Sequence, residues 1–431
     1  KMELIIDPGV RSWGTYYGGS SSDMSHSCVT DLQGNVYLSG DTQSSLSSGA
    51  IATTGAHQTL FGGGAISDAF LVKFNATGTR LWGTYYGGGG HENGYCCATD
   101  LNNNVYMVGA ASNYTTSIIA TPGSYLTTIS AVSAAFLVKF NSNGIRQWGT
   151  YFPGTAYSCI TDIKGNLYFA GTAGDMTGIT TATSHQMTNS GNGDAFLAKF
   201  DTSGNFSWAT YYGGTLRETG YSCTADTAGN IYLSGESASS NAIATSGSYQ
   251  TIWAGGYSDA FLVKFNKNGV RQWGTYFGGA ASDIAYSCSA DIGGNIYISG
   301  ATSSSISIAT PGSHQSVYNA AGDGFLAKFD SNGMRQWSTY IGSWCGEDVQ
   351  CCYADDFGNV YVSGWTCSNY ASTIVTPDAP QPNLMGSSSN AFLVKFNSLG
   401  VRDWGTYYGT SVPSNVLQAY CCTADKNGNA F

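Results

Sequence analysis

The sequence of 431 residues is poor in charge and contains no long apolar run. Only 10% of the residues are charged, 17 of them are Lys or Arg, and the formal net charge is -10, so nucleic acid and anionic membranes are poor partner candidates. No stretch of about 18 apolar residues occurs, which argues against membrane insertion through a helix. No segment sustains the period of a helix, and glycine is spread throughout, which excludes a helical solenoid. No charged segment followed by an apolar one opens the chain, so we expect any signal peptide to lie outside it.

Three short words recur along the chain and define a repeat. Variants of Trp-Gly-Thr-Tyr-Tyr-Gly-Gly begin at Trp13, Trp82, Trp148, Trp208, Trp273, Trp337 and Trp404. The word Asp-x-x-Gly-Asn-x-Tyr begins at Asp31, Asp100, Asp162, Asp226, Asp291, Asp355 and Asp425, with small departures in two copies. Variants of Ala-Phe-Leu-Val-Lys-Phe end at Phe74, Phe140, Phe200, Phe265, Phe329 and Phe396. The first and last tryptophans are 391 positions apart over six intervals, a period of about 65 residues, which is typical of propellers and solenoid arrays.

Each repeat predicts four antiparallel strands. In the first complete repeat they cover residues 27–30, 36–39 and 70–74 and the segment around Trp82, with Asp-x-x-Gly-Asn and Asn-Ala-Thr-Gly turns between them. Four such strands make one propeller blade. We therefore predict an all-β, seven-bladed β-propeller that forms a single domain over residues 1–431. Its blade repeats start near Cys28, Cys97, Cys159, Cys223, Cys288 and Cys352.

The third word occurs six times rather than seven, and this predicts how the ring closes. Residues 2–6 stand where the third word stands elsewhere, so residues 1–19 resemble the third and fourth strands of a blade. Residues 417–431 supply the first strand and the start of the second. We therefore expect a composite closing blade from 417–431 plus 1–19, because pairing the two ends removes exposed sheet edges.

These words resemble the bacterial seven-bladed β-propeller repeat family, often called the SBBP repeat. The family's pattern is matched by Asp259-Ala-Phe-Leu-Val-Lys264, by Trp273-Gly-Thr-Tyr-Phe-Gly-Gly279 and by Asp291-Ile-Gly-Gly-Asn-Ile-Tyr297, and the match recurs over essentially the whole chain. The resemblance implies a secreted or surface-attached bacterial protein. The family carries no single activity and no shared catalytic residues, so it assigns none here.

Seven of the 12 cysteines stand three residues before the repeat aspartates. A ring of thiols for metal or redox chemistry is one interpretation. We favour small buried residues where innermost strands crowd together, because a metal site needs ligands that converge on one ion. Outside the repeat, Cys345 and Cys367 flank the two strands joined by the turn at Asp355, so a disulfide between them is geometrically plausible and would favour an oxidising compartment.

Most histidines and carboxylates have structural interpretations. His57, His185 and His314 share a repeat slot with Tyr125 and Tyr249, which indicates packing. The repeat aspartates fit turns, not a calcium loop. The carboxylates that recur after Gly-Gly are expected to cap loops, with a carboxylate cluster at one mouth of the ring as the alternative; they are Asp23, Glu92, Glu218, Asp283 and Glu347. We find no catalytic signature and predict no cofactor.

Candidate contact residues are therefore unrepeated ones near the long second-to-third and blade-to-blade connections. They are Trp253, Trp344, Trp365, His26, His91 and Glu92. The predicted function is a non-enzymatic extracellular or cell-surface module for adhesion, binding or surface-filament assembly, with a protein partner or a second copy bound at the loop-decorated face. The alternative is a polysaccharide-binding or polysaccharide-active propeller that uses the same face, since exposed aromatics stack on sugars.

Overall fold

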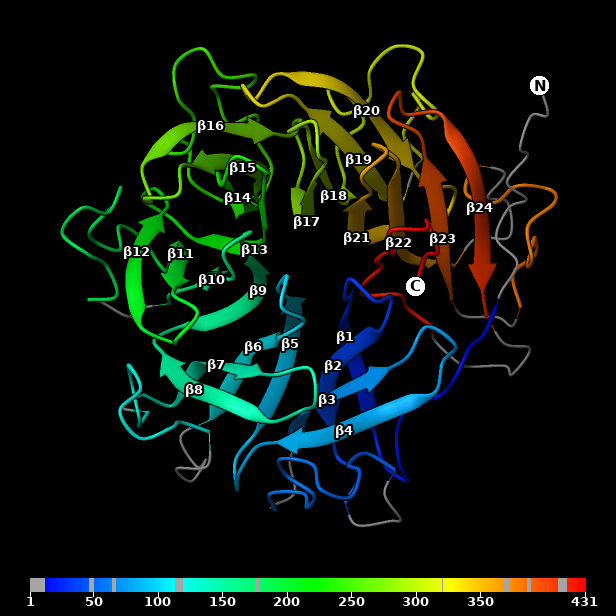
Figure 1. Cartoon of the computed structure of the whole chain (residues 1–431). Helices are drawn as coiled ribbons and strands as arrows, with labels where there is room; N and C mark the ends of the chain where they lie inside the picture. The colour runs from blue at the N-terminus through cyan, green and yellow to red at the C-terminus, as the bar shows by residue number, and fades with distance from the viewer. Residues whose placement is uncertain are drawn as a thin grey trace.

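The computed structural model describes residues 12–45, 50–63, 67–112, 119–129, 131–174, 178–319, 321–367, 373–385, 389–409 and 417–431. These residues form six antiparallel sheets of four strands arranged as blades around a common axis (Figure 1). In each blade the strands lie side by side in sequence order. The chain is therefore an all-β propeller, as predicted. Among the described residues, no helix is long and apolar enough to cross a membrane.

The strands occupy four concentric positions. The innermost strands, which carry the repeat cysteines, are β1 (Asp23–Thr30), β5 (Glu92–Thr99), β9 (Thr155–Thr161), β13 (Glu218–Ala225), β17 (Asp283–Ala290) and β21 (Asp348–Ala354). The second strands are β2 (Val36–Thr42), β6 (Val105–Ser112), β10 (Leu167–Thr172), β14 (Ile231–Ser237), β18 (Ile296–Thr302) and β22 (Val360–Thr366). The third strands, which carry the third word, are β3 (Asp68–Phe74), β7 (Ser133–Phe140), β11 (Ala195–Phe200), β15 (Asp259–Phe265), β19 (Asp323–Phe329) and β23 (Asn390–Phe396). The outermost strands are β4 (Arg80–Tyr86), β8 (Arg146–Phe152), β12 (Phe206–Tyr212), β16 (Arg271–Phe277), β20 (Arg335–Ile341) and β24 (Arg402–Tyr408).

The repeat aspartates stabilise turns, as expected. Asp31 Oδ1 accepts hydrogen bonds from the backbone N–H groups of Gln33 (3.0 Å) and Asn35 (2.9 Å), so it holds the turn between β1 and β2. Lys73, which belongs to the third word in β3, contacts this turn. Its Nζ lies 3.3 Å from Asp31 Oδ2 and 4.9 Å from the centre of the Tyr37 ring. The second and third words are therefore coupled within one blade.

The tryptophan word joins neighbouring blades. Trp82 Nε1 in β4 donates to the carbonyl of Ser142 in the next blade (3.1 Å), and the same turn presents Gly144, at a φ of 77°, against the indole ring. A side chain at Gly144 would meet both this backbone conformation and the Trp82 ring. Tyr86 OH donates to the carbonyl of Ile119 (2.7 Å), so the recurring Ile-Ala-Thr segment is ordered scaffold.

The apolar core lies between neighbouring blades. One cluster joins Tyr106 and Leu137 of the second blade to Leu167 and Phe196 of the third, and all four side chains are fully buried. Each sheet thus uses both faces to exclude water, which is how stacked blades stabilise a ring.

The predicted number of seven four-stranded blades is wrong, because the described residues form six. Residues 1–11 lie outside the described part of the chain, and residues 12–19 are not assigned to a strand. Residues 417–431 form one isolated β-bridge, between Ala424 and Ala430, and not a ladder of paired strands. Only Ala430 and Phe431 follow the turn at Asp425, so too few residues remain in this sequence for a ladder.

Both end segments nevertheless occupy positions that resemble those of a blade. Trp13 Nε1 donates to Ala76 O (3.0 Å), as Trp82 does one blade further on, and the Trp13 ring lies 6.0 Å from that of Phe431. Near the ring axis, Thr30 Oγ1 of β1 donates to Ala424 O (3.1 Å). On the other side, Tyr361 OH of β22 donates to Gly428 O (3.3 Å). The C-terminal segment therefore lies between the first and sixth blades (Figure 1).

Candidate functional site

Every innermost strand contains a β-bulge two residues before the repeat cysteine. In β1 the pairing register shifts between Ser25 and Ser27, and His26 is the extra residue. The equivalent register shifts single out Tyr95, Tyr157, Tyr221, Tyr286 and Gln350. Tyr420 is the corresponding residue of the C-terminal segment. Because a bulge re-aims its side chain, we define these seven residues, His26, Tyr95, Tyr157, Tyr221, Tyr286, Gln350 and Tyr420, as the aromatic collar.

The rings of the aromatic collar form a continuous row from blade to blade. Successive centroid distances are 6.1 Å for Tyr420–His26, 5.5 Å for His26–Tyr95, 5.7 Å for Tyr95–Tyr157, 5.9 Å for Tyr157–Tyr221 and 5.6 Å for Tyr221–Tyr286. Each member is partly accessible to solvent, and Tyr420 is 37% exposed. Such spacing suits tilted aromatic pairs, and it leaves ring edges and hydroxyl groups available to a ligand.

Carboxylates lie directly beside the collar. His26 Nε2 is 2.6 Å from Asp41 Oδ1, and Tyr221 OH donates to Glu236 Oε1 (2.9 Å). Asp41 and Glu236 occupy the same position in β2 and β14, one residue after the glycine that pairs near the bulge. Burial, Asp348 and Glu236 together raise the pKa of Tyr286 to about 12. Burial and Glu236 also raise the pKa of Tyr221, so both hydroxyls remain hydrogen-bond donors at neutral pH.

A second group of polar residues, the junction carboxyl pairs, lies buried between neighbouring blades. They are Asp68–Glu92, Asp194–Glu218, Asp259–Asp283 and Asp323–Glu347, each joining the start of a third strand to the start of the next innermost strand. A glycine, such as Gly87 in the first pair, lies against both carboxyl groups, and its lack of a side chain leaves room for them to approach each other. A Cβ added to Gly87 would lie only 2.6 Å from Glu92 Oε2 and 2.8 Å from Asp68 Oδ1. In the first-named aspartate of each pair, Oδ1 has no hydrogen-bond partner.

Burial raises the pKa of a carboxyl group in each of the four pairs. Burial, together with the charge of Asp283, raises the pKa of Asp259 to about 7 despite the hydrogen bond from the Ala254 N–H. The pKa of Asp68 and that of Asp323 are likewise raised to about 7, mainly by burial and further by the partner carboxylate. Protonation of one carboxyl group in a pair avoids placing two charges together. Within the described residues, no group of three or more His, Cys, Asp or Glu side chains is arranged to hold a metal ion.

The six contact candidates from the sequence are distributed over different environments. Glu92 is fully buried and caps a loop by accepting from Gly88 N (2.9 Å), the structural role expected for the carboxylates after Gly-Gly. His91 is exposed, and its Nδ1 lies 2.8 Å from Ser67 Oγ. His26 alone among the six belongs to the aromatic collar.

The three tryptophans also differ from one another. Trp344 is 75% exposed in the connection between β20 and β21. Trp253 is half-buried, packs against the core around Tyr168 and has an indole N–H without a hydrogen-bond partner. Trp365 lies within β22, opposite Asp348, rather than in a loop. Of these, Trp344 offers the surface that a partner can reach.

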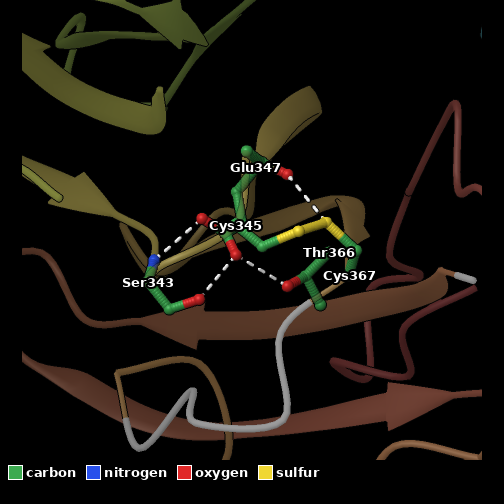
Figure 2. Close-up of a disulfide and its surroundings, with 6 residues drawn as sticks. Ser343, Cys345, Glu347, Thr366 and Cys367 are labelled. Carbon is green, nitrogen blue, oxygen red and sulfur yellow. Dashed lines mark hydrogen bonds between the residues drawn. A yellow bond between two sulfur atoms is a disulfide. The ribbon is translucent and has the colours of Figure 1, made fainter. Parts of the chain in front are cut away.

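A disulfide joins Cys345 to Cys367, with the two Cα atoms 5.8 Å apart (Figure 2). It links the segment that enters β21 to the segment that leaves β22. Glu347 lies beside it and accepts hydrogen bonds from Ser343 Oγ (2.6 Å) and Thr366 Oγ1 (2.8 Å). Covalent and polar links therefore fix the two strand ends together.

Sequence reasoning missed the rest of the collar because it set repeated residues aside as scaffold. The signal was present, since six of the seven positions two residues before the repeat cysteine are His or Tyr. The bulge itself has no sequence signature here, so the direction of these side chains could not be predicted.

No protein-family model and no curated protein matches the chain. Among solved structures, it is similar to a protein of unknown function from Bacteroides caccae, with 12% identity and a TM-score of 0.39 over 78% of this chain and 89% of the other. It is also similar to the Pan2 WD40 domain of Neurospora crassa, with 8% identity and a TM-score of 0.46 over 94% and 84%. A Hadza microbial sialidase, Hz136, matches with 10% identity and a TM-score of 0.40 over 80% and 63%. These low scores contribute nothing to the functional argument below.

Proposed function

We propose that this chain is a non-catalytic extracellular or cell-surface binding module in which the propeller holds the aromatic collar against a partner. The observation that carries the proposal is the bulge repeated in every innermost strand, which places a ring or amide at the same position each time. A β-bulge disrupts its ladder locally, so repetition at one site favours a role for the redirected side chain.

The ligand class is a second part of the proposal. The partner we infer first is a protein surface or a second copy of this chain, because exposed aromatics such as Trp344 and Tyr420 anchor protein interfaces. A glycan is the second candidate. The Asp41 and Glu236 carboxylates beside two of the rings, together with the Gln350 amide, favour a glycan, since sugars present apolar faces and hydroxyl groups together.

Location and family belong to the same proposal. The Cys345–Cys367 disulfide supports an oxidising compartment, because structural disulfides persist outside the cytosol. The recurring words support membership in the SBBP-like bacterial repeat proteins. The contacts of Trp13 with Ala76 and Phe431 bring the two described end segments together.

The test compares a Tyr221→Ala/Tyr286→Ala double variant with Tyr257→Ala, a control at a residue that is 78% exposed and lies outside the collar. Self-association is measured by sedimentation velocity, and glycan binding is measured by calorimetry with hexasaccharides of glucose, N-acetylglucosamine and xylose. We expect the collar variant to lose at least about fivefold in affinity for one of these probes, since an aromatic contact contributes about 1 kcal/mol.

Two results would contradict the proposal. One is binding that is equal in the wild type, the collar variant and the control. The other is hydrolysis of a hexasaccharide that disappears in Asp41→Asn, because that result would make the chain an enzyme. Circular dichroism of each variant checks that the ring remains folded.

A further inference from the structure

The residue before each repeat cysteine contacts the neighbouring innermost strand. Where this residue is serine, its hydroxyl accepts a hydrogen bond from the backbone N–H of the next repeat cysteine. The distances are 3.1 Å from Cys223 N to Ser158 Oγ and 3.1 Å from Cys352 N to Ser287 Oγ. Ser27 and Ser222 make the same contact. This position therefore joins blade to blade around the axis.

Cysteine replaces serine at three of these positions, Cys96, Cys351 and Cys421. Their sulfur atoms contact backbone carbonyl groups instead, as Cys96 Sγ does at 3.7 Å from Cys159 O. Cys96 stands between two serine repeats, whereas Cys351 and Cys421 stand in consecutive ones. Two thiols consequently meet across the junction between β21 and the C-terminal segment, with their Sγ atoms 3.9 Å apart.

This junction is where the ring closes on a short segment. Residues 417–431 contain only the bridge between Ala424 and Ala430, in contrast to the full ladders of the six blades. The segment is held by single contacts, such as Cys421 Sγ to Cys28 O at 3.4 Å and Tyr361 OH to Gly428 O at 3.3 Å. A covalent link here would fix a weakly paired element.

We propose that Cys351 and Cys421 are an oxidation site, at which a second disulfide closes the ring covalently between the sixth blade and the C-terminal segment. The sulfur atoms must approach by about 1.9 Å to reach the bonding distance of about 2.05 Å, a movement that side-chain rotation and a small strand shift supply. The existing Cys345–Cys367 disulfide lies in the same blade, so the same oxidising conditions reach both pairs.

The oxidant is a small-molecule disulfide such as oxidised glutathione. One protein thiolate attacks it, forms a mixed disulfide and releases one glutathione thiol. The second protein thiolate then attacks the protein sulfur of that mixed disulfide and releases the other glutathione thiol. Two protein thiols are oxidised and one glutathione disulfide is reduced to two glutathione thiols, which carry, by way of solvent, the two protons that the protein thiols lose.

The local environment makes this reaction slow at neutral pH. A hydrogen bond with Cys421 lowers the pKa of Cys351, but contact with Cys422 and burial raise it overall, well above its usual value. We therefore expect the link to form faster as the pH rises, because only the thiolate attacks.

The full chain is incubated at pH 8.5 with and without oxidised glutathione, its remaining thiols are alkylated with iodoacetamide, and peptides are sequenced by mass spectrometry. We expect a linked pair of peptides whose fragments place the bond between Cys351 and Cys421. We also expect a rise in Tm on the order of 5 °C on oxidation, because the link closes a long loop. Both effects should be absent in Cys351→Ser and present in Cys96→Ser.

These variants suit the question because serine is the natural residue at this position in four other repeats. A Cys28–Cys421 bond would overturn the proposal, and so would full alkylation of Cys351 and Cys421 after oxidation. An equal rise in Tm in Cys351→Ser would show that the stabilisation arises elsewhere. None of these outcomes depends on whether the aromatic collar binds a partner.

Discussion

Replacing Asp259 by asparagine should make the ring less sensitive to alkaline pH. Asp259 is fully buried, and its Oδ2 accepts a hydrogen bond from Ala254 N (2.7 Å). Its other carboxyl oxygen has no partner and faces Asp283 across Gly278, where an added Cβ would lie 3.0 Å from Asp259 Oδ1 and 2.7 Å from Asp283 Oδ2. The sixth blade already carries asparagine at this position, Asn390, so the substitution is compatible with the fold.

The magnitude follows from proton linkage. The pKa of Asp259 is raised from 3.8 to about 7, so the folded chain keeps a proton that the unfolded chain releases. This contribution to stability is fully present below pH 3.8 and is lost as the pH rises through about 7. Between pH 5 and pH 8.5 it removes about 2–3 kcal/mol from the free energy of unfolding, at about 1.4 kcal/mol per pKa unit. Asparagine does not titrate, so the variant avoids this loss.

The assay is urea unfolding of wild type and Asp259→Asn at pH 5, 7 and 8.5. Comparing the two chains at each pH cancels the titrating groups that lie far from Asp259, which both chains share, including the half-buried histidines. From pH 5 to pH 8.5, we expect the free energy of unfolding of the variant to rise relative to that of the wild type by about 2–3 kcal/mol. A difference in the free energy of unfolding that stays constant over this range would refute the raised pKa of Asp259.

Two further substitutions test the packing of the repeat slots and of the end segments. The pKa of His57 is lowered from 6.5 to about 4, mainly by burial and further by Arg146, so its contribution to stability is lost as the pH falls through this interval. Tyrosine occupies this slot in other repeats, as Tyr125 and Tyr249. When the pH falls from 7 to 4.5, the free energy of unfolding measured in urea should therefore decrease by about 1–3 kcal/mol less in His57→Tyr than in the wild type. Trp13→Ala removes the contacts with Phe74 and Phe431 and should cost about 2 kcal/mol by thermal unfolding, whereas Trp344→Ala, at a residue 75% exposed, should change stability by less than about 0.5 kcal/mol.

The recurring motifs were sufficient to predict the four-stranded blade, because each motif forms one turn or one strand through contacts close in sequence. Asp31 and Asn35 form a turn from contacts within five residues, and a largely apolar third word such as Asp259–Phe265 forms a buried strand. The blade count was not predictable in the same way. It depends on whether two segments far apart in sequence pair with each other, which is a tertiary outcome that no local pattern determines. The bridge that forms at Ala424 is to Ala430, within the C-terminal segment itself.

The candidate site was harder to predict for a different physical reason. Unrepeated residues were favoured on the assumption that scaffold positions recur and functional positions do not. In a ring, however, the innermost strands bring one repeat position to a common axis, so a repeated residue contributes several copies to one surface. Tyr157, Tyr221 and Tyr286 are separated by about 65 positions in sequence, yet their rings contact in succession at 5.9 and 5.6 Å. By contrast, the unrepeated Trp253 packs against an apolar cluster between the third and fourth blades. In closed repeat proteins the positions at the bulges of the innermost strands therefore deserve the first search for a ligand site, because symmetry there concentrates side chains that elsewhere it would spread apart.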